Sequence, residues 1–410
     1  MEIVALEIFM PTAENNSSDK KSLIFLLGSC QYPPDIVRQR HAYKTLNQIK
    51  KYVSGNYSSR LKNEIVAIIT GDSIYADATA GLFDPVEEVS RYQNAYIAFN
   101  NAPQKKALDR SSINFLFTID DHEIEENWEP PDPEDLMLDG KRHFLLGHQR
   151  GAGLKLPAGV DISDHLKNTE TLPLWRVEKR QNTSLFLMDT RTEREHRRLN
   201  NTSTAKLISN EQKQALFQWL DFMHAQDIDH PELAAEPKFI VSGSMLLPRQ
   251  QFVAQAPDDI SVCLNSDAWD GYPATMNEVL AYIARNNIKN VVFLSGDAHI
   301  PCFAEAELHC GDSCEKTIVY SIHAAPFHAP FPFGNGIKEN YAEVDSFKIK
   351  IENSETIQLK TELDVRIQSE FPEIGNGFIS FQIPEQNDKR LLTFNFIGDA
   401  GESTHEIQLQ

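Results

Sequence analysis

Two residues with metal-binding side chains stand two positions apart after an apolar segment. Residues 290–295 are mostly apolar, and Asp297 and His299 follow them closely. Alternate residues of an extended chain share one side, so this carboxylate and this imidazole would point the same way. Such a pair could bind one metal ion. A second apolar segment, residues 65–70, leads through a glycine to Asp72, which suggests that both chain segments contribute to one site.

Three further side chains near segment ends have metal-binding chemistry. Asp120 and Asp121 lie at the end of the apolar segment that begins at residue 113. Keeping two adjacent carboxylates ionised at the end of a buried strand costs free energy unless a cation is close by. Cys30 follows the first apolar segment and would bind as a thiolate, which favours a transition metal over magnesium. Taken alone, Cys30 is more often a small buried hydrophobe, and Tyr75 a core aromatic with a satisfied hydroxyl.

Arg191 could bind a phosphate group. It comes two residues after Asp189, where another apolar segment ends. Its planar guanidinium could clamp two phosphate oxygens. A structural pairing between Asp189 and Arg191 is the alternative.

The elements that must position these residues alternate between two periodicities. Apolar runs typical of buried strands span residues 22–27, 65–70, 113–119, 184–188, 238–241 and 290–295. Between them, residues 216–223 and 276–283 repeat apolar side chains at helical spacing. Strands alternating with helices predict an α/β architecture, in which ligands sit beyond the carboxyl ends of the strands. If the strands are parallel neighbours, the candidate residues would meet at one sheet edge.

The C-terminal part of the chain has a different pattern. Apolar and polar residues alternate there, which predicts antiparallel strands with one polar face over residues 347–351, 378–383 and 391–397. Upstream, residues 129–140 are acidic and contain prolines, which predicts a solvated loop. We expect three parts: an N-terminal strand and flexible lead-in (1–21), a catalytic core (22–345) and an antiparallel β segment packed on the same domain (346–410).

Composition limits the partners. The formal net charge of −20 disfavours a broad nucleic-acid surface or an anionic membrane surface, whereas small or metal-screened anions remain allowed. No signal-peptide pattern, twin-arginine motif or apolar stretch of roughly 20 residues is seen, which predicts a cytoplasmic protein, with export by a non-standard route left open. The oligomeric state is not indicated.

The five cysteines do not form the pattern of a secreted disulfide framework. Cys310 and Cys314, with His309 beside them, could bind a metal. A turn between two strands is the alternative.

Taken together, the motifs resemble those of the PhoD-like alkaline phosphatases, which belong to the calcineurin-like metallophosphoesterases. Each motif is short, and the combination in this order is what makes the resemblance specific. It runs from Leu23 to Glu305 and rests on Ser29-Cys30, Gly71-Asp72-Ser73-Ile74-Tyr75-Ala76-Asp77, Asp120-Asp121-His122-Glu123, Asp189-Thr190-Arg191, Asp267-Ala268-Trp269-Asp270-Gly271-Tyr272-Pro273 and Gly296-Asp297-Ala298-His299.

The resemblance implies a fold and a first metal site. The fold would be α/β, with two stacked mixed β-sheets flanked by helices, and the C-terminal antiparallel strands would complete the second sheet. Asp72 would bridge two metals. Cys30, Tyr75 and His299 would complete a site for ferric iron.

The resemblance also implies a second metal, held by Asp121 and Asp297. Calcium is the expected ion there, and oxygen donors favour it as well. Asn127 is a further candidate ligand, although Glu126 stands where the family pattern has a second asparagine. Zn²⁺, Mn²⁺ or Mg²⁺ are alternatives, so the ion at each position is open.

The activity implied by the resemblance is hydrolysis of a phosphoric ester. A dinuclear metal centre would activate water for attack on phosphorus, and His122 would protonate the leaving oxygen. Alternatively, His122 only hydrogen-bonds Asp120 or a backbone carbonyl. The substrate would be a phosphorylated small molecule, either a monoester or a diester. The alternatives are a metal-dependent nucleotide or oligonucleotide phosphodiesterase, and a non-catalytic metal-binding or interaction protein that retains the fold.

Overall fold

A computed structural model describes most of the chain. The described ranges are residues 22–33, 42–57, 63–77, 88–111, 113–130, 134–154, 166–181, 183–229, 236–310, 316–329, 336–351, 361–383 and 391–410. The predicted N-terminal strand and flexible lead-in, residues 1–21, lie outside these ranges.

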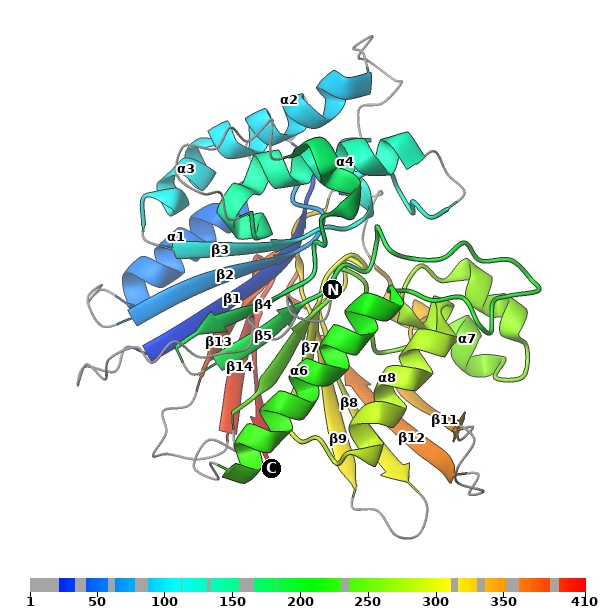
Figure 1. Ribbon diagram of the computed structural model, residues 1–410. Coiled ribbons are helices and arrows are strands. Elements are labelled where there is room, and N and C mark those ends of the chain that lie inside the picture. The colour runs from blue at the N-terminus through cyan, green and yellow to red at the C-terminus, as the bar shows by residue number, and fades with distance from the viewer. Residues whose placement is uncertain are drawn as a thin grey trace.

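The first sheet has seven strands, and its centre is parallel (Figure 1). Neighbouring strands follow the order β15-β14-β13-β1-β2-β3, and β10 pairs with β1. β1, β2 and β3 are parallel, whereas β13, β14 and β15 are antiparallel to their neighbours. The strands are β1 (Ser22–Gln31), β2 (Asn63–Thr70), β3 (Ile113–Thr118), β10 (Pro326–His328), β13 (Gly377–Gln382), β14 (Leu391–Gly398) and β15 (Glu402–Gln408).

The second sheet has eight strands in the order β11-β12-β8-β9-β7-β6-β5-β4. Its central strands β5, β6, β7 and β9 run parallel, and the strands toward both edges are antiparallel. The strands are β4 (Arg176–Arg180), β5 (Thr183–Leu187), β6 (Lys238–Val241), β7 (Val291–Ser295), β8 (Cys302–Cys310), β9 (Thr317–His323), β11 (Val344–Ile351) and β12 (Thr361–Glu370).

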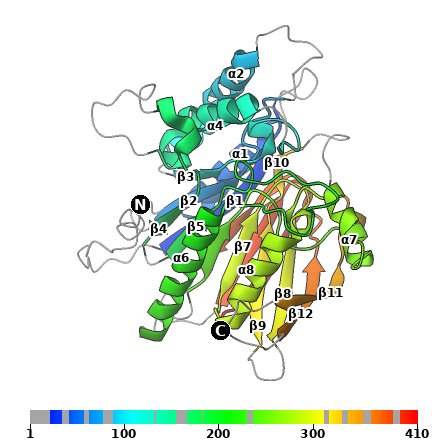
Figure 2. The same ribbon diagram turned by 45° about the vertical axis from the view of Figure 1, so that its right-hand side comes forward.

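Helices cover the outer faces of the two sheets. In Figures 1 and 2, α1 to α4 lie over the first sheet, and α6 and α8 run along the second. None of the helices in the described ranges combines the length and the apolar character needed to cross a bilayer. The helices are α1 (Lys44–Asn56), α2 (Glu88–Asn101), α3 (Pro103–Asp109), α4 (Glu134–His148), α6 (Asn210–Asp229), α7 (Gln251–Gln255) and α8 (Pro273–Arg285), with 3-10 turns η1 (Asp121–Glu123), η2 (Gln149–Ala152), η3 (Leu166–Thr171), η4 (Ile260–Asn265), η5 (Trp269–Gly271) and η7 (Lys338–Asn340).

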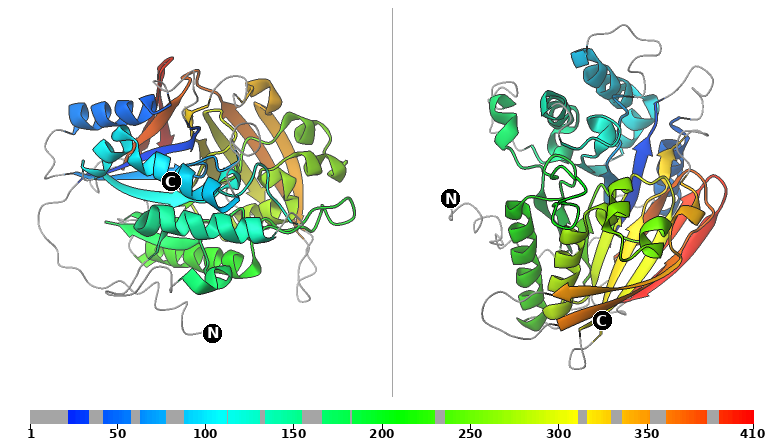
Figure 3. Two further views of the ribbon diagram at one scale, coloured as in Figure 1. Left: turned by 90° about the horizontal axis from the view of Figure 1, so that it is seen from above. Right: turned by 90° about the vertical axis from the view of Figure 1, so that its right-hand side faces the viewer.

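The side chains of β1 show why the layers stack. Leu23, Phe25 and Leu27 pack between the two sheets, together with apolar side chains of β5, β6 and β7. Ile24 and Leu26 point the other way, into the core beneath α1, α2 and α4. A strand covered on both faces needs apolar residues at every position, so it forms a continuous apolar run. Figure 3 shows the layers from two further directions.

The predicted α/β class and the two stacked sheets are confirmed. All six predicted apolar runs are strands, namely β1, β2, β3, β5, β6 and β7, and the two predicted helical segments are α6 and α8.

Two local expectations were wrong. The C-terminal strands do not complete the second sheet alone: β11 and β12 extend it through β8, whereas β13 to β15 extend the first sheet through β1. The C-terminal strands could pair in antiparallel fashion with either β1 or β8. The alternation of apolar and polar residues along a strand does not specify which of these partners it takes. The predicted loop over residues 129–140 also ends earlier, because α4 begins at Glu134 and buries Phe144 and Leu145 in the core.

Candidate metal centre

The predicted metal ligands come together from both sheets. Cys30 is at the end of β1, Asp72 follows β2, and Asp121 follows β3, all in the first sheet. Asp297 and His299 follow β7 in the second sheet. The site therefore lies where the carboxyl ends of two stacked sheets face each other, and not along the edge of one sheet.

Two glycines allow these chain segments to approach closely. Gly71 has φ of +80°, and a Cβ there would lie 2.4 Å from Cβ of Asp120. A Cβ on Gly296 would lie 2.4 Å from Cβ of Ser29. The carbonyl of Gly71 also accepts the backbone amide hydrogen of Cys30 at 3.4 Å. A larger residue at either glycine would push the strand ends apart.

The first group of ligands surrounds Asp72. Donor atoms of Cys30, Asp72 and His299 lie within 4.8 Å of one another. The Cys30 thiol donates to Oδ2 of Asp72 at 3.4 Å, and the Tyr75 hydroxyl lies 2.9 Å from Nε2 of His299 and 3.5 Å from the same Asp72 oxygen. A thiol, a phenol, an imidazole and a carboxylate therefore converge on one point, and this donor set suits a transition metal.

A second group is purely acidic apart from His122. Asp72, Asp121 and His122 form one cluster, and Asp120, Asp121 and Asp297 form another. Within each cluster the donor atoms lie within 4.8 Å of one another. Oδ1 of Asp72, Oδ2 of Asp120 and Oδ1 of Asp121 are buried, and no described residue hydrogen-bonds to them. Buried carboxylate oxygens that accept no hydrogen bond cost free energy, so their arrangement fits one or more bound cations.

The electrostatics of these carboxylates lead to the same conclusion. Burial, followed by repulsion from Asp121, raises the pKa of Asp72 well above its ordinary value. Burial, followed by Asp120 and Asp121, does the same to the pKa of Asp297. Burial raises the pKa of Asp120 to about 6, although Arg191 opposes the shift. Positive charge at this point would keep the carboxylates ionised.

The backbone is strained at the ligand positions. Cys30, Asp72, Asp297 and His299 have φ values of 55°, 53°, 83° and 55°, in the left-handed region that non-glycine residues rarely adopt. Such conformations persist only where the surrounding structure enforces them, and they gather at functional sites. Four of the six predicted ligands are therefore held by the fold in costly conformations.

Asn127 lies beside the centre through its backbone. Its amide donates to Oδ2 of Asp121 at 2.7 Å, and its own φ is 54°. The residue is exposed. This contact fixes one oxygen of Asp121, whereas the role of Asn127 as a ligand remains a prediction.

His122 is at the solvent side of the cluster. Its ring lies over that of Tyr75, with centroids 3.9 Å apart, and its Nδ1 is 2.8 Å from a carboxylate oxygen of Asp77. Burial opposes the charged form, but the carboxylates of Asp121, Asp72 and Asp77 hold the pKa of His122 well above its ordinary value. The hydrogen-bond partner is thus the Asp77 carboxylate, and neither Asp120 nor a backbone carbonyl.

Arg191 is completely buried behind the acidic residues. Its Nε and Nη2 donate to Oδ1 of Asp120 at 2.8 and 2.6 Å, and Nη2 also donates to Asp267 at 2.7 Å. Asp189 accepts the backbone amide of Arg191 and does not pair with the guanidinium. Arg194 holds the other oxygen of Asp267 at 2.5 Å. The guanidinium of Arg191 thus fixes Asp120, and its action on phosphate remains a prediction.

Sequence reasoning missed two residues that organise the site. Glu123 accepts hydrogen bonds from the loops after β2 and β3, and burial raises its pKa to about 7 although these bonds oppose the shift. Asp267 joins two buried arginines, Arg191 and Arg194. Both are acidic residues inside motifs that the sequence analysis quotes. Their place in those motifs is the only feature of the sequence that pointed to a role at the site.

Of the three residues considered for a second metal site, the structure describes His309 and Cys310. Cys310 is buried in the core of the second sheet, and His309, its neighbour on β8, lies 3.4 Å from Glu307. Neighbouring strand residues point to opposite faces, so these two side chains diverge. Cys314 lies outside the described residues.

The chain is similar to known proteins in sequence and in fold. A family model described as PhoD-like phosphatase matches residues 57–367. Alkaline phosphatase D of Bacillus subtilis (strain 168) is 27% identical over 224 residues, which are 51% of this chain and 34% of that protein. The match therefore spans about a third of the length of this relative. A solved structure described as the structure of PhoD superposes with a TM-score of 0.57 at 18% identity, over 95% of this chain and 69% of that one, which supports the fold. The chain belongs to the PhoD-like phosphatase family.

Proposed function

We propose that this protein hydrolyses phosphoric esters at a dinuclear metal centre. One observation carries the proposal: Asp72, Asp120 and Asp121, each with a buried carboxylate oxygen that accepts no hydrogen bond from the described residues, belong to acidic clusters beside a thiol, a phenol and an imidazole. Membership of the PhoD-like phosphatase family supports the reaction class. The substrate is a small phosphorylated molecule, because the formal net charge of −20 disfavours a long polyanion such as a nucleic acid.

The chain offers two adjoining sets of ligands that share Asp72. Cys30, Tyr75 and His299 would complete a site for Fe³⁺, and Asp121 and Asp297 would hold Ca²⁺, with Zn²⁺, Mn²⁺ or Mg²⁺ as alternatives. When bound, the metals would neutralise phosphate charge and lower the pKa of a water molecule that attacks phosphorus.

Asp120 belongs with the second set. Its carboxylate clusters with those of Asp121 and Asp297, while its Oδ1 is held by Arg191 and its Oδ2 accepts no hydrogen bond from the described residues. Arg191 would therefore act by fixing a carboxylate against the centre.

The proton for the leaving oxygen would come from His122. Asp77 fixes the ring through Nδ1, which leaves Nε2 to carry the transferable proton. The Asp77 carboxylate favours the protonated ring, as a general acid requires. Tyr75 supports the ring from one face, so the acid is held in one orientation.

The test combines elemental analysis with hydrolysis of p-nitrophenyl phosphate and bis-p-nitrophenyl phosphate. Cys30→Ala, Asp72→Asn and Asp297→Asn should each lose metal and turnover together. Cys263→Ala, at a buried cysteine in η4, and Asp259→Asn, at an exposed carboxylate, are the matched controls and should keep both.

The results separate the alternatives. Unchanged metal content in all three ligand variants would overturn the site assignment. Bound metal without turnover of any ester would favour a non-catalytic metal-binding protein. Strong, salt-dependent binding to DNA would favour the oligonucleotide phosphodiesterase.

A further inference from the structure

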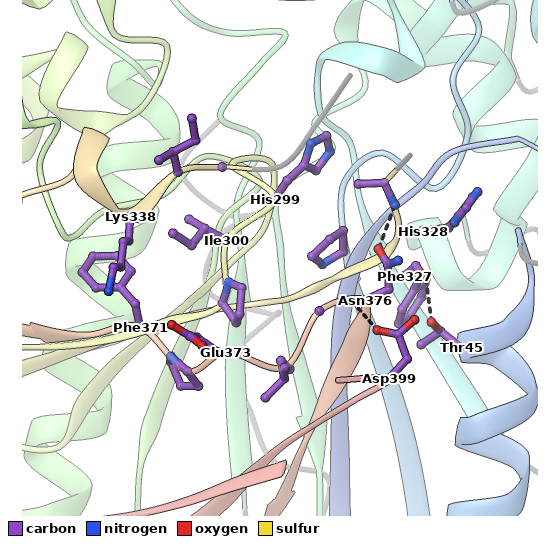
Figure 4. Close-up of a pocket in the computed structure, with 18 of the residues that line it drawn as sticks. Thr45, His299, Ile300, Phe327, His328, Lys338, Phe371, Glu373, Asn376 and Asp399 are labelled. Atoms are coloured by element: carbon purple, nitrogen blue, oxygen red, sulfur yellow. Dashed lines mark hydrogen bonds between the residues drawn. The ribbon is translucent and has the colours of Figure 1, made fainter. Parts of the chain in front are cut away.

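A large cavity adjoins the metal centre at His299. Its volume is about 860 Å³, and it lies between the loop after β7, strand β10, the turn η7 and the segment that joins β12 to β13. Figure 4 shows His299 at the upper rim, with Ile300 below it and Phe371 and Phe327 on opposite sides. We call this space the His299 cavity. One ligand of the proposed metal centre is therefore also part of the cavity wall.

Part of the wall of the His299 cavity is apolar, and its side chains are packed into the protein. Ile300 and Phe327 are nearly inaccessible, at 6% and 3% exposure, because each is also part of a hydrophobic core. Phe371 is half-buried, and its ring lies 6.3 Å from that of Tyr341. Rigid apolar and aromatic walls are typical of sites that bind the organic part of a ligand.

Polar groups surround the apolar walls. Lys338 and Glu373 are exposed, and the structure, within its described residues, gives neither side chain a hydrogen bond or an ion pair. Asn376 uses its carbonyl oxygen to accept the amide of Ala329 at 3.0 Å, so its NH₂ group can donate toward the cavity. Asp399 is already held by the backbone amide of Asn376 at 3.2 Å. The rim thus offers hydrogen-bond donors at Lys338 and Asn376 and an acceptor at Glu373. It therefore carries one positive and one negative side chain next to the apolar part of the wall.

The dimensions exclude phosphate alone as the occupant. Sites for drug-sized ligands have volumes of roughly 300 to 1,000 Å³, and a phosphate group would leave most of this cavity empty. The balance of charge at Lys338 and Glu373 does not suit a polyanion. An organic group with a ring against Phe371 and polar substituents at the rim would match both walls and rim.

We propose that the His299 cavity receives the organic ester group of the substrate, a bulky alcohol that carries a ring. The inference rests on the proposed function, because a phosphorus atom bound at the metal centre would place an ester group beside His299. It adds selectivity: large ring-bearing esters are bound and turned over in preference to small alkyl esters.

Phosphonates separate the two parts of the inference, because they bind without being hydrolysed. Calorimetry on the metal-loaded protein should show phenylphosphonate and naphthylphosphonate binding roughly tenfold or more tightly than methylphosphonate, since aromatic contacts of this kind correspond to factors of that order. In Phe371→Ala this preference should fall by roughly fivefold or more. The affinity for methylphosphonate and the metal content should stay unchanged.

Two further variants make the test specific. Phe222→Ala removes an exposed phenylalanine on α6 and should behave as the unchanged protein. Phe371→Trp keeps a ring in the wall and should retain the preference.

Each failure has its own signature. Equal affinity for methyl- and phenylphosphonate, or a preference that survives in Phe371→Ala, would overturn the cavity assignment and leave the metal centre standing. No binding of any phosphonate by metal-loaded protein would overturn the proposed function, and the cavity assignment with it.

Discussion

The carboxylate of Glu123 accepts the backbone amide hydrogen of Asp72 at 3.0 Å. The same carboxylate accepts the amide and the hydroxyl of Ser73, both at 2.7 Å, and the amide of Asp120 at 2.9 Å. One buried side chain thus ties the turn after β2 to the turn after β3. These two turns carry three of the acidic residues of the metal centre, so their spacing depends on Glu123.

The Glu123→Gln variant should lose stability and metal together. At pH 8 the carboxylate is ionised, since its pKa is about 7, and a glutamine amide would direct N–H groups at backbone donors. Hydrogen bonds to charged groups are worth about 1.5–3 kcal/mol each, so we expect a loss of about 2–3 kcal/mol in the free energy of unfolding. Urea denaturation and elemental analysis check this. Glu125→Gln is the control, and equal stability in the two variants would contradict a positioning role.

The His122→Asn variant should keep its metals and lose turnover. Loss of a general acid lowers rates by roughly 10²–10⁴-fold, and most for esters whose leaving group needs the proton. The deficit should therefore be larger for an alkyl phosphate than for p-nitrophenyl phosphate, and steady-state kinetics with both esters measure it. His224→Asn on α6 is the matched control. A deficit independent of the leaving group would mean that His122 acts in some other way.

The Arg191→Met variant should be strongly destabilised. The guanidinium pairs with Asp120 at 2.6 Å and with Asp267 at 2.7 Å, and its removal leaves Asp120 without a cation, whereas Asp267 keeps its pairing with Arg194. Breaking a buried pair in this way costs about 3–5 kcal/mol, to be measured as a free energy of unfolding in urea.

Two companions to Arg191→Met make that result interpretable. Arg198→Met alters an exposed arginine of the same segment and should be nearly neutral. Adding Asp120→Asn to Arg191→Met should restore part of the loss, because it removes the carboxylate charge that has lost its cation. Purely additive effects would show that Asp120 and Arg191 are not coupled.

His148 should make the protein acid-sensitive. It is stacked on Phe117 at 3.6 Å, and its Nε2 lies 2.7 Å from the Ser73 hydroxyl. Burial, followed by the charge of Lys105, holds the pKa of His148 well below its ordinary value of 6.5. A depressed folded-state pKa means that the neutral ring stabilises the fold above pH 6.5 and that this contribution is lost as the pH falls.

The His148→Gln variant should therefore be less sensitive to acid. Between pH 7.5 and 5, the unchanged protein should lose up to about 2 kcal/mol more than the variant, since each pH unit below 6.5 corresponds to about 1.4 kcal/mol. Urea denaturation at both pH values measures the difference. Parallel pH dependence in the two proteins would show that His148 does not titrate on unfolding.

The sequence alone determined the strands and the kinds of ligand. Residues 65–69 and 291–294 are apolar at every position because both faces of β2 and β7 are covered, and burial favours apolar residues in the local sequence. The motifs that follow them also contain the metal-binding residues Asp72 and Asp297. Local pattern and side-chain chemistry are properties of consecutive residues, so they can be read without a structure.

Only the tertiary structure decided which elements meet. Asp72 and Asp297 belong to different sheets, and Arg191 pairs with Asp267, 76 residues away. The C-terminal strands also divide between the two sheets, although their alternation is the same in kind. Strand pairing, the paired charges behind the metal centre and the His299 cavity depend on the free energy of the whole packed chain. Contacts between distant residues contribute that free energy, and no local pattern specifies them.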